Sequence, residues 1–243
     1  MHFHLPKPMH GWRAFAGEVG IIVVGILIAL SLEQIVSTLR DRATAAEARS
    51  IIRGEIEANL KTMMLRSETE PCMQTRLREI AVFLDATERG LKPTPLRWVG
   101  APFAPLLSHS GFQSAQSAGT SFLLPQAEQQ HIAKLYLDFG DFNESNTREW
   151  YDWAQLRTLA NAPAELSAPE LVRLRSALQD AGAADSLVRI DIAYAMTEAR
   201  EYGLELPRKR TDPKQIASVC LAADTPNEEA VKLARQNGVL FSE

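Results

Sequence analysis

Hydrophobic residues are concentrated near the start of the chain, where Val19–Leu32 contains no charged residue. As a helix this run spans only about 21 Å, against about 30 Å for the hydrocarbon core of a bilayer. The wider segment Phe15–Val36 carries only Glu18 and Glu33, both near its ends, where charges are less costly. We therefore interpret residues 15–36 as an uncleaved transmembrane helix.

Two other interpretations of this segment remain open. A cleaved signal peptide needs a basic start and a small-x-small cleavage site, for which Lys7, Arg13 and Ala29-Leu30-Ser31 offer a weak match. A helix buried in a soluble bundle is the second, although an all-apolar helix is unusual outside a large core. The helical pattern runs past Ser31 without a break, which disfavours cleavage there.

Apolar positions spaced by three and four residues predict helices through most of the remaining chain. Glu33–Thr69 is rich in helix-forming residues and would form a stalk, and Pro71 is expected to start a second helix that Gly90 ends. Five of the thirteen prolines lie in residues 91–125, which predicts an irregular loop with a short helix near Gly111–Ala118.

Two further long helices follow this loop. Pro125–Ala160 carries one apolar stripe, and Ser167-Ala-Pro-Glu170 is a capping box before an apolar seam that runs to Leu206. The alternation typical of strands is absent, so the predicted fold is all-α: a transmembrane helix continuing into a stalk, then an antiparallel helical bundle with a Pro-rich loop. The expected parts are an N-terminal cytoplasmic tail (1–14), the transmembrane helix (15–36), a bundle domain (37–206) containing loop 91–125, and a C-terminal tail with a short helix (207–243).

Composition excludes some classes of function. The chain is 46% hydrophobic with a net charge of −4, which rules out global disorder and argues against nucleic acid as the main partner. Neither a GxxxxGK[ST] nor a GxGxxG motif is present, so nucleotide binding has no support, and we expect no cofactor.

The two cysteines, Cys72 and Cys220, are predicted to form a disulfide if the body lies in an oxidising compartment. The bond would close a loop of about 150 residues and contribute about 5 kcal/mol in the chain-entropy model. The alternative is that they are two unrelated small hydrophobic residues.

Metal binding is not expected. Glu128 and His131 have the ExxH spacing of di-iron bundles, but the further ligands of such sites are missing, so a surface or capping role is favoured. The tail histidines His2, His4 and His10 match the spacing of no fixed metal site.

A concentration of aromatic residues between the loop and the third helix is a possible contact surface for a partner. Such a cluster can equally be the core beneath a lid. The residues proposed for this surface are Trp98, Phe103, Phe112, Trp150 and Trp153.

Catalytic chemistry has little support in the sequence, and no catalytic residue is assigned. Ser108-His109-Ser110 lies in the loop, but no GxSxG motif is present. A membrane-tethered hydrolase or small-molecule binder that uses loop 91–125 is the alternative function, and a pocket joining His109 to a serine and a carboxylate would favour it.

Asp185 interrupts the apolar seam and would set the helix register, meet a neighbouring arginine, or turn to solvent at a bend near Gly182.

The N-terminal stretch HFHLPKPMHGWRAFAGEVGIIVVGILIAL resembles the start of a family of uncharacterised single-pass inner-membrane proteins of Gram-negative bacteria. The likeness covers His2–Val36, and Cys72, Arg76-Leu77 and Cys220 are loosely similar. The resemblance implies an inner-membrane anchor and a helical body, and it implies no catalytic residues.

Basic residues flank the anchor on both sides, and their count alone slightly favours a cytoplasmic position for the C-terminal part. Lys7 and Arg13 precede it, and Arg40, Arg42 and Arg49 follow it. Because the N-terminal tail is short and basic, we place it in the cytoplasm and the body in the periplasm.

The expected function is that of an accessory, scaffold or sensor-like module. Its expected partners are the lipid bilayer and another envelope protein or a second copy of the chain.

Overall fold

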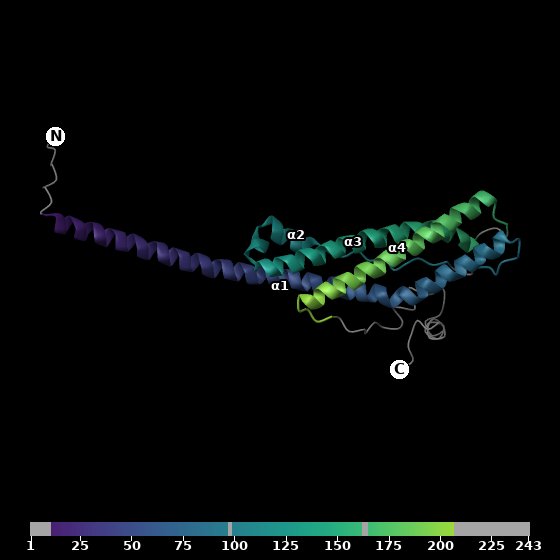
Figure 1. Ribbon diagram of the computed structural model, residues 1–243, viewed down its shortest axis with the longest axis horizontal. Helices are drawn as coiled ribbons and strands as arrows, with labels where there is room; N and C mark the ends of the chain where they lie inside the picture. The colour runs from purple at the N-terminus through teal and green to yellow at the C-terminus, as the bar shows by residue number, and fades with distance from the viewer. Residues whose placement is uncertain (1–10, 97–98, 162–164, 207–243) are drawn as a thin grey trace, which may run out of the picture.

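The computed structural model describes residues 11–96, 99–161 and 165–206, and this part of the chain is all-α with no strand (Figure 1). The long helices α3 and α4 pack antiparallel to each other, and α4 runs antiparallel to the second half of α1, against which it packs. The elements in chain order are α1 (Trp12–Glu88), α2 (Ser110–Ser117), the 3-10 turn η1 (Thr120–Leu123), α3 (Gln126–Leu156), the 3-10 turn η2 (Arg157–Asn161) and α4 (Ala168–Glu201).

Helix α1 is one continuous element of 77 residues, about 115 Å long. The prediction that Pro71 starts a separate helix was wrong, because Pro71 lies inside α1. An internal proline costs a helix about 3 kcal/mol and bends it, and α1 changes direction in its blue section (Figure 1). Packing on both sides offsets this cost, since Met63 before the proline and Met73 after it are both fully buried.

Two hydrophobic clusters form the core of the bundle, one on each side of this bend. The first joins Ile52 and Ile56 of α1 to Phe139 of α3, and the second joins Ile80 of α1 to Trp153 of α3. Helix α4 contributes to both clusters. Each long helix therefore buries an apolar stripe along nearly the whole bundle.

Several predicted helix ends are confirmed. Gly90, with φ of 68°, follows the end of α1 at Glu88, as expected of a glycine beyond a helix C-terminus. At the start of α4 the Glu170 carboxylate accepts hydrogen bonds from the backbone N–H of Ser167 at 2.8 Å and from its hydroxyl at 2.6 Å. The short helix α2 lies within one residue of its predicted bounds.

The N-terminal part of α1 extends beyond the bundle (Figure 1). It is the one helix of the described chain that is long and apolar enough to cross a membrane, with a mean hydropathy of 2.4 in its most apolar window. None of that window is buried, so the segment is not a core helix of this chain's own bundle. Thr44 and Ala45 are the first residues at which the bundle begins to cover α1 continuously.

Candidate functional site

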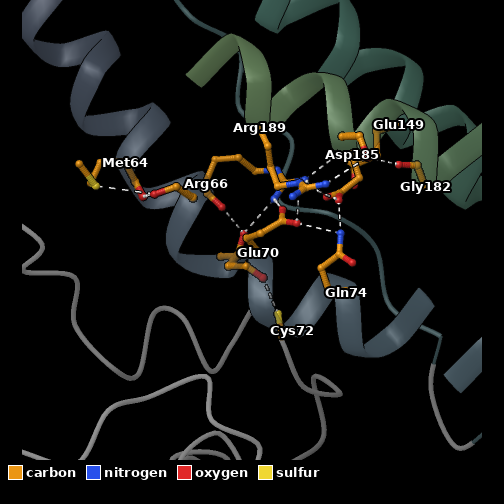
Figure 2. A network of polar contacts seen from close by, with 12 residues as sticks. Met64, Arg66, Glu70, Cys72, Gln74, Glu149, Gly182, Asp185 and Arg189 are labelled. Carbon is orange, nitrogen blue, oxygen red and sulfur yellow. Dashed lines mark hydrogen bonds and ion pairs between the residues drawn. The ribbon is translucent and has the colours of Figure 1, made fainter. Parts of the chain in front are cut away.

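A cluster of charged side chains lies between the two hydrophobic clusters, where α1 bends (Figure 2). Arg66 of α1 is at its centre and is fully buried, as are Glu149 of α3 and Asp185 of α4. Buried charges are costly unless they are paired. This cluster is therefore the most unusual chemical feature of the described structure.

The Arg66 guanidinium joins all three long helices. One terminal nitrogen lies 2.7 Å from Glu149 Oε2 and 3.1 Å from Asp185 Oδ1, and the other lies 3.3 Å from Glu70 Oε2. Arg189 adds a second cation, with Nε 3.2 Å from Glu70 Oε1. The Gln74 amide donates hydrogen bonds to both Glu70 and Asp185.

The cluster contains one more carboxylate than cations, because Glu70, Glu149 and Asp185 face Arg66 and Arg189. Burial and the neighbouring Asp185 raise the pKa of Glu70 to about 7. Burial also raises the pKa of Glu149, while Arg66 opposes the shift. Burial acts to lower the pKa of Arg66, but the adjacent carboxylates outweigh it and the pKa is raised. Near neutral pH it is therefore Glu70 that gains or loses a proton, while Arg66 keeps its charge.

Sequence patterning identified one member of this cluster and missed its centre. Asp185 meets an arginine from a neighbouring helix, which confirms one of the three alternatives for this residue. Arg66 was not singled out, although it follows Met63 at a spacing of three on the buried stripe of α1. A charged residue within an apolar stripe was the signal in both cases.

A second polar centre joins α1 to the loop. The Glu55 carboxylate accepts hydrogen bonds from the Ser108 hydroxyl at 2.6 Å and from the Tyr136 hydroxyl. Three more donors reach it, namely the Ser110 hydroxyl at 3.1 Å and the backbone N–H groups of Gly111 at 3.0 Å and Phe112 at 3.1 Å. Burial acts to raise the pKa of Glu55, but these hydrogen bonds outweigh it and lower the pKa to about 2. Glu55 thereby caps the N-terminus of α2 from another helix.

This arrangement does not favour the hydrolase alternative. The His109 ring lies against the Tyr136 ring, with centroids 5.6 Å apart. Within the described residues it has no hydrogen bond to Ser108, Ser110 or Glu55. A catalytic histidine must lie between its nucleophile and its acid, whereas here the serines contact the carboxylate directly.

The aromatic residues predicted as a contact surface lie in several environments. Phe112 stacks on Tyr136 at 4.3 Å beside the first core cluster, and Trp153 is fully buried in the second. Phe103 is half-buried, and Trp98 lies outside the described residues. Trp150 is 40% exposed, with the Arg157 guanidinium 4.7 Å from its ring centre. Trp150 is thus the most accessible of the described four.

Glu128 and His131 have separate partners. The Glu128 carboxylate forms a bidentate pair with Arg49 at 2.7 and 2.8 Å, and His131 Nδ1 lies 2.6 Å from Glu198. Among the described residues, no group of three or more His, Cys, Asp or Glu side chains is arranged to hold a metal ion. The tail histidines His2, His4 and His10 lie outside the described residues.

Cys72 lies one residue after Pro71 and is 5% exposed. Its Sγ is 3.0 Å from the backbone carbonyl oxygen of Thr69 (Figure 2). Cys220 and the predicted short C-terminal helix lie outside the described residues, so the Cys72–Cys220 bond stays a prediction.

Comparison with known protein families, curated proteins and solved structures finds no match to this chain.

Proposed function

We propose that this protein is a single-pass membrane protein of the bacterial inner membrane, whose helical bundle acts in the periplasm as an accessory or scaffold module through protein contacts. The observation that carries this proposal is the continuity of α1. One helix contains both the exposed apolar segment 15–36 and the core residues Ile52 and Ile56. The bundle is therefore rigidly connected to the anchor.

The exposed apolar segment supports membrane insertion on energetic grounds. Burial of apolar surface contributes roughly 25 cal/mol per Å², and large side chains such as Ile21, Ile22 and Leu27 are each more than half exposed. The bundle does not cover them, so lipid is the environment that removes them from water.

The roles of the two polar centres favour a contact function. Both polar centres hold helices together: Arg66 joins α1, α3 and α4, and Glu55 fixes α2 to α1. The exposed aromatic pair Trp150 and Tyr151 offers a place for a protein partner, since aromatic side chains are enriched at interfaces.

Topology reporters test the proposal. Alkaline phosphatase, active only in the periplasm, and a fluorescent protein, active only in the cytoplasm, would be fused after Ala45 and after Leu206. We expect phosphatase activity and no fluorescence at both points. Fluorescence at both would reverse the orientation and would remove the oxidising compartment that the Cys72–Cys220 bond needs.

The cysteine pair offers a second test of the same placement. In protein denatured directly from cells, Cys72 and Cys220 should resist a thiol reagent until a reductant is added. Labelling of both without reductant would contradict the disulfide.

A further inference from the structure

The turn that links α2 to α3 forms the end of the bundle nearest the anchor (Figure 1). Two large apolar residues on η1 are open to solvent there: Phe122 is 72% exposed and Leu123 is 42% exposed. Two adjacent exposed apolar side chains at a loop tip form a candidate contact surface.

The turn also lacks charge. From Ser110 to Ala127 the chain contains no Asp, Glu, Lys or Arg, although these residues make up 23% of the whole. An exposed turn on a soluble domain normally carries charged side chains. Because it has no charge to desolvate, an apolar tip can enter the interfacial layer of a membrane at low cost.

The level of the turn along α1 follows from its contacts. The η1 turn packs against α1, and Glu128, five residues after Leu123, pairs with Arg49 of α1 at 2.7 Å. The turn therefore lies level with the first covered residues of α1, near Thr44.

The helical rise converts this level into a distance from the membrane. Val36, the last residue of the anchor, is eight residues before Thr44, which corresponds to about 12 Å. A typical tilt of about 20° towards the side of the turn would lower a turn about 10 Å from the α1 axis by a further 3 Å or so. The headgroup layer is about 5–8 Å thick, and a phenylalanine side chain spans the small gap that remains.

We propose that the η1 turn, through Phe122 and Leu123, contacts the headgroup layer of the same membrane that α1 spans. This inference rests on the proposed function, because it needs the anchor to be in lipid. Exposed Arg40 and Arg42, between the anchor and the bundle, would add attraction to anionic headgroups. The contact restrains the tilt of the bundle and fixes which of its faces is turned away from the membrane.

Photo-crosslinking of the full chain tests this contact. The photoreactive residue p-benzoylphenylalanine would replace Phe122 in proteoliposomes of phosphatidylethanolamine and phosphatidylglycerol, and lipid adducts would be measured by mass spectrometry after irradiation. Tyr151 is the matched control, because it is an aromatic residue of similar exposure, 67%, on α3. It lies 25 residues beyond Gln126, about 37 Å farther from the membrane. Leu27, within the anchor, is the positive control.

We expect lipid adducts at positions 27 and 122, with a yield at 122 several-fold above that at 151. If position 27 gives lipid adducts but position 122 gives no more than position 151, the inference is overturned and the anchor is left intact. Crosslinked dimers at 122 without lipid adducts would overturn it in favour of self-association. Failure at both 27 and 122 would overturn the anchor and the inference together.

Discussion

Replacing Arg66 by methionine removes the cation at the centre of the buried cluster while keeping an unbranched apolar side chain in its place. Arg66 is fully buried and contacts Glu149 at 2.7 Å, Asp185 at 3.1 Å and Glu70 at 3.3 Å. Breaking a buried pair by removing one partner typically costs about 3–5 kcal/mol, because the remaining charge stays buried without compensation. We expect Arg66→Met to lower the free energy of unfolding by this amount at pH 8.

The loss should shrink at lower pH. Without Arg66 the buried carboxylates can be neutralised by protons, and the pKa of Glu70 is already about 7 in the intact cluster. Each unit by which the variant raises the pKa of a carboxylate corresponds to about 1.4 kcal/mol. At pH 5 the destabilisation should therefore be smaller than at pH 8 by at least about 1.4 kcal/mol.

Urea unfolding of the full chain in mild detergent, followed by circular dichroism and tryptophan fluorescence at both pH values, measures this difference. Arg148→Met is the matched control, because Arg148 pairs with Glu144 on the surface, where both side chains are more than half exposed. It should cost about 0–1 kcal/mol at either pH. A loss at Arg66 no larger than at Arg148, or one independent of pH, would refute the assigned role of the cluster.

Three further predictions concern the other polar groups. Glu70 has a raised pKa, so near neutral pH the folded protein keeps a proton that the unfolded chain has released. The free energy of unfolding should therefore fall as pH rises from about 4.5 to 7, by about 1–2 kcal/mol after allowing for solvent screening. Glu70→Gln should flatten this slope in urea titrations. Glu55 has a pKa lowered to about 2, so its contribution is present above about pH 4.5 and is lost towards pH 2; Glu55→Gln should cost about 1–2 kcal/mol at pH 7, with increased amide exchange in α2. Replacing both Cys72 and Cys220 by serine should lower the melting temperature under non-reducing conditions and abolish any effect of reductant, whereas equal melting of variant and wild type would contradict the bond.

The helical architecture could be predicted from the sequence because local signals specify it. The three-four spacing of apolar residues indicates the helices themselves. Their ends are set by residues close by, such as Gly90 and the capping sequence at Ser167. The exposed apolar segment of α1 was also visible as a run without charge. Local signals failed at Pro71, where burial of Met63 and Met73 on both sides outweighs the local penalty of proline.

The polar centres could not be predicted because their contacts are far apart in sequence. Arg66 and Asp185 are 119 residues apart, and Glu55 and Tyr136 are 81 residues apart. A single sequence shows that Asp185 interrupts an apolar seam, but it does not show which cation lies opposite. For the same reason the aromatic residues near the loop looked like one surface, whereas Phe112 and Trp153 pack in different core clusters.

Membrane extraction tests most directly whether the apolar part of α1 lies in lipid. Cell membranes containing the full chain would be washed with alkaline carbonate and sedimented, beside a chain that starts at Arg40 and keeps every residue of the bundle. We predict that the full chain stays in the pellet until detergent is added, and that the shorter chain is found in the supernatant. Full-length protein in the carbonate supernatant would contradict the insertion of α1 in lipid.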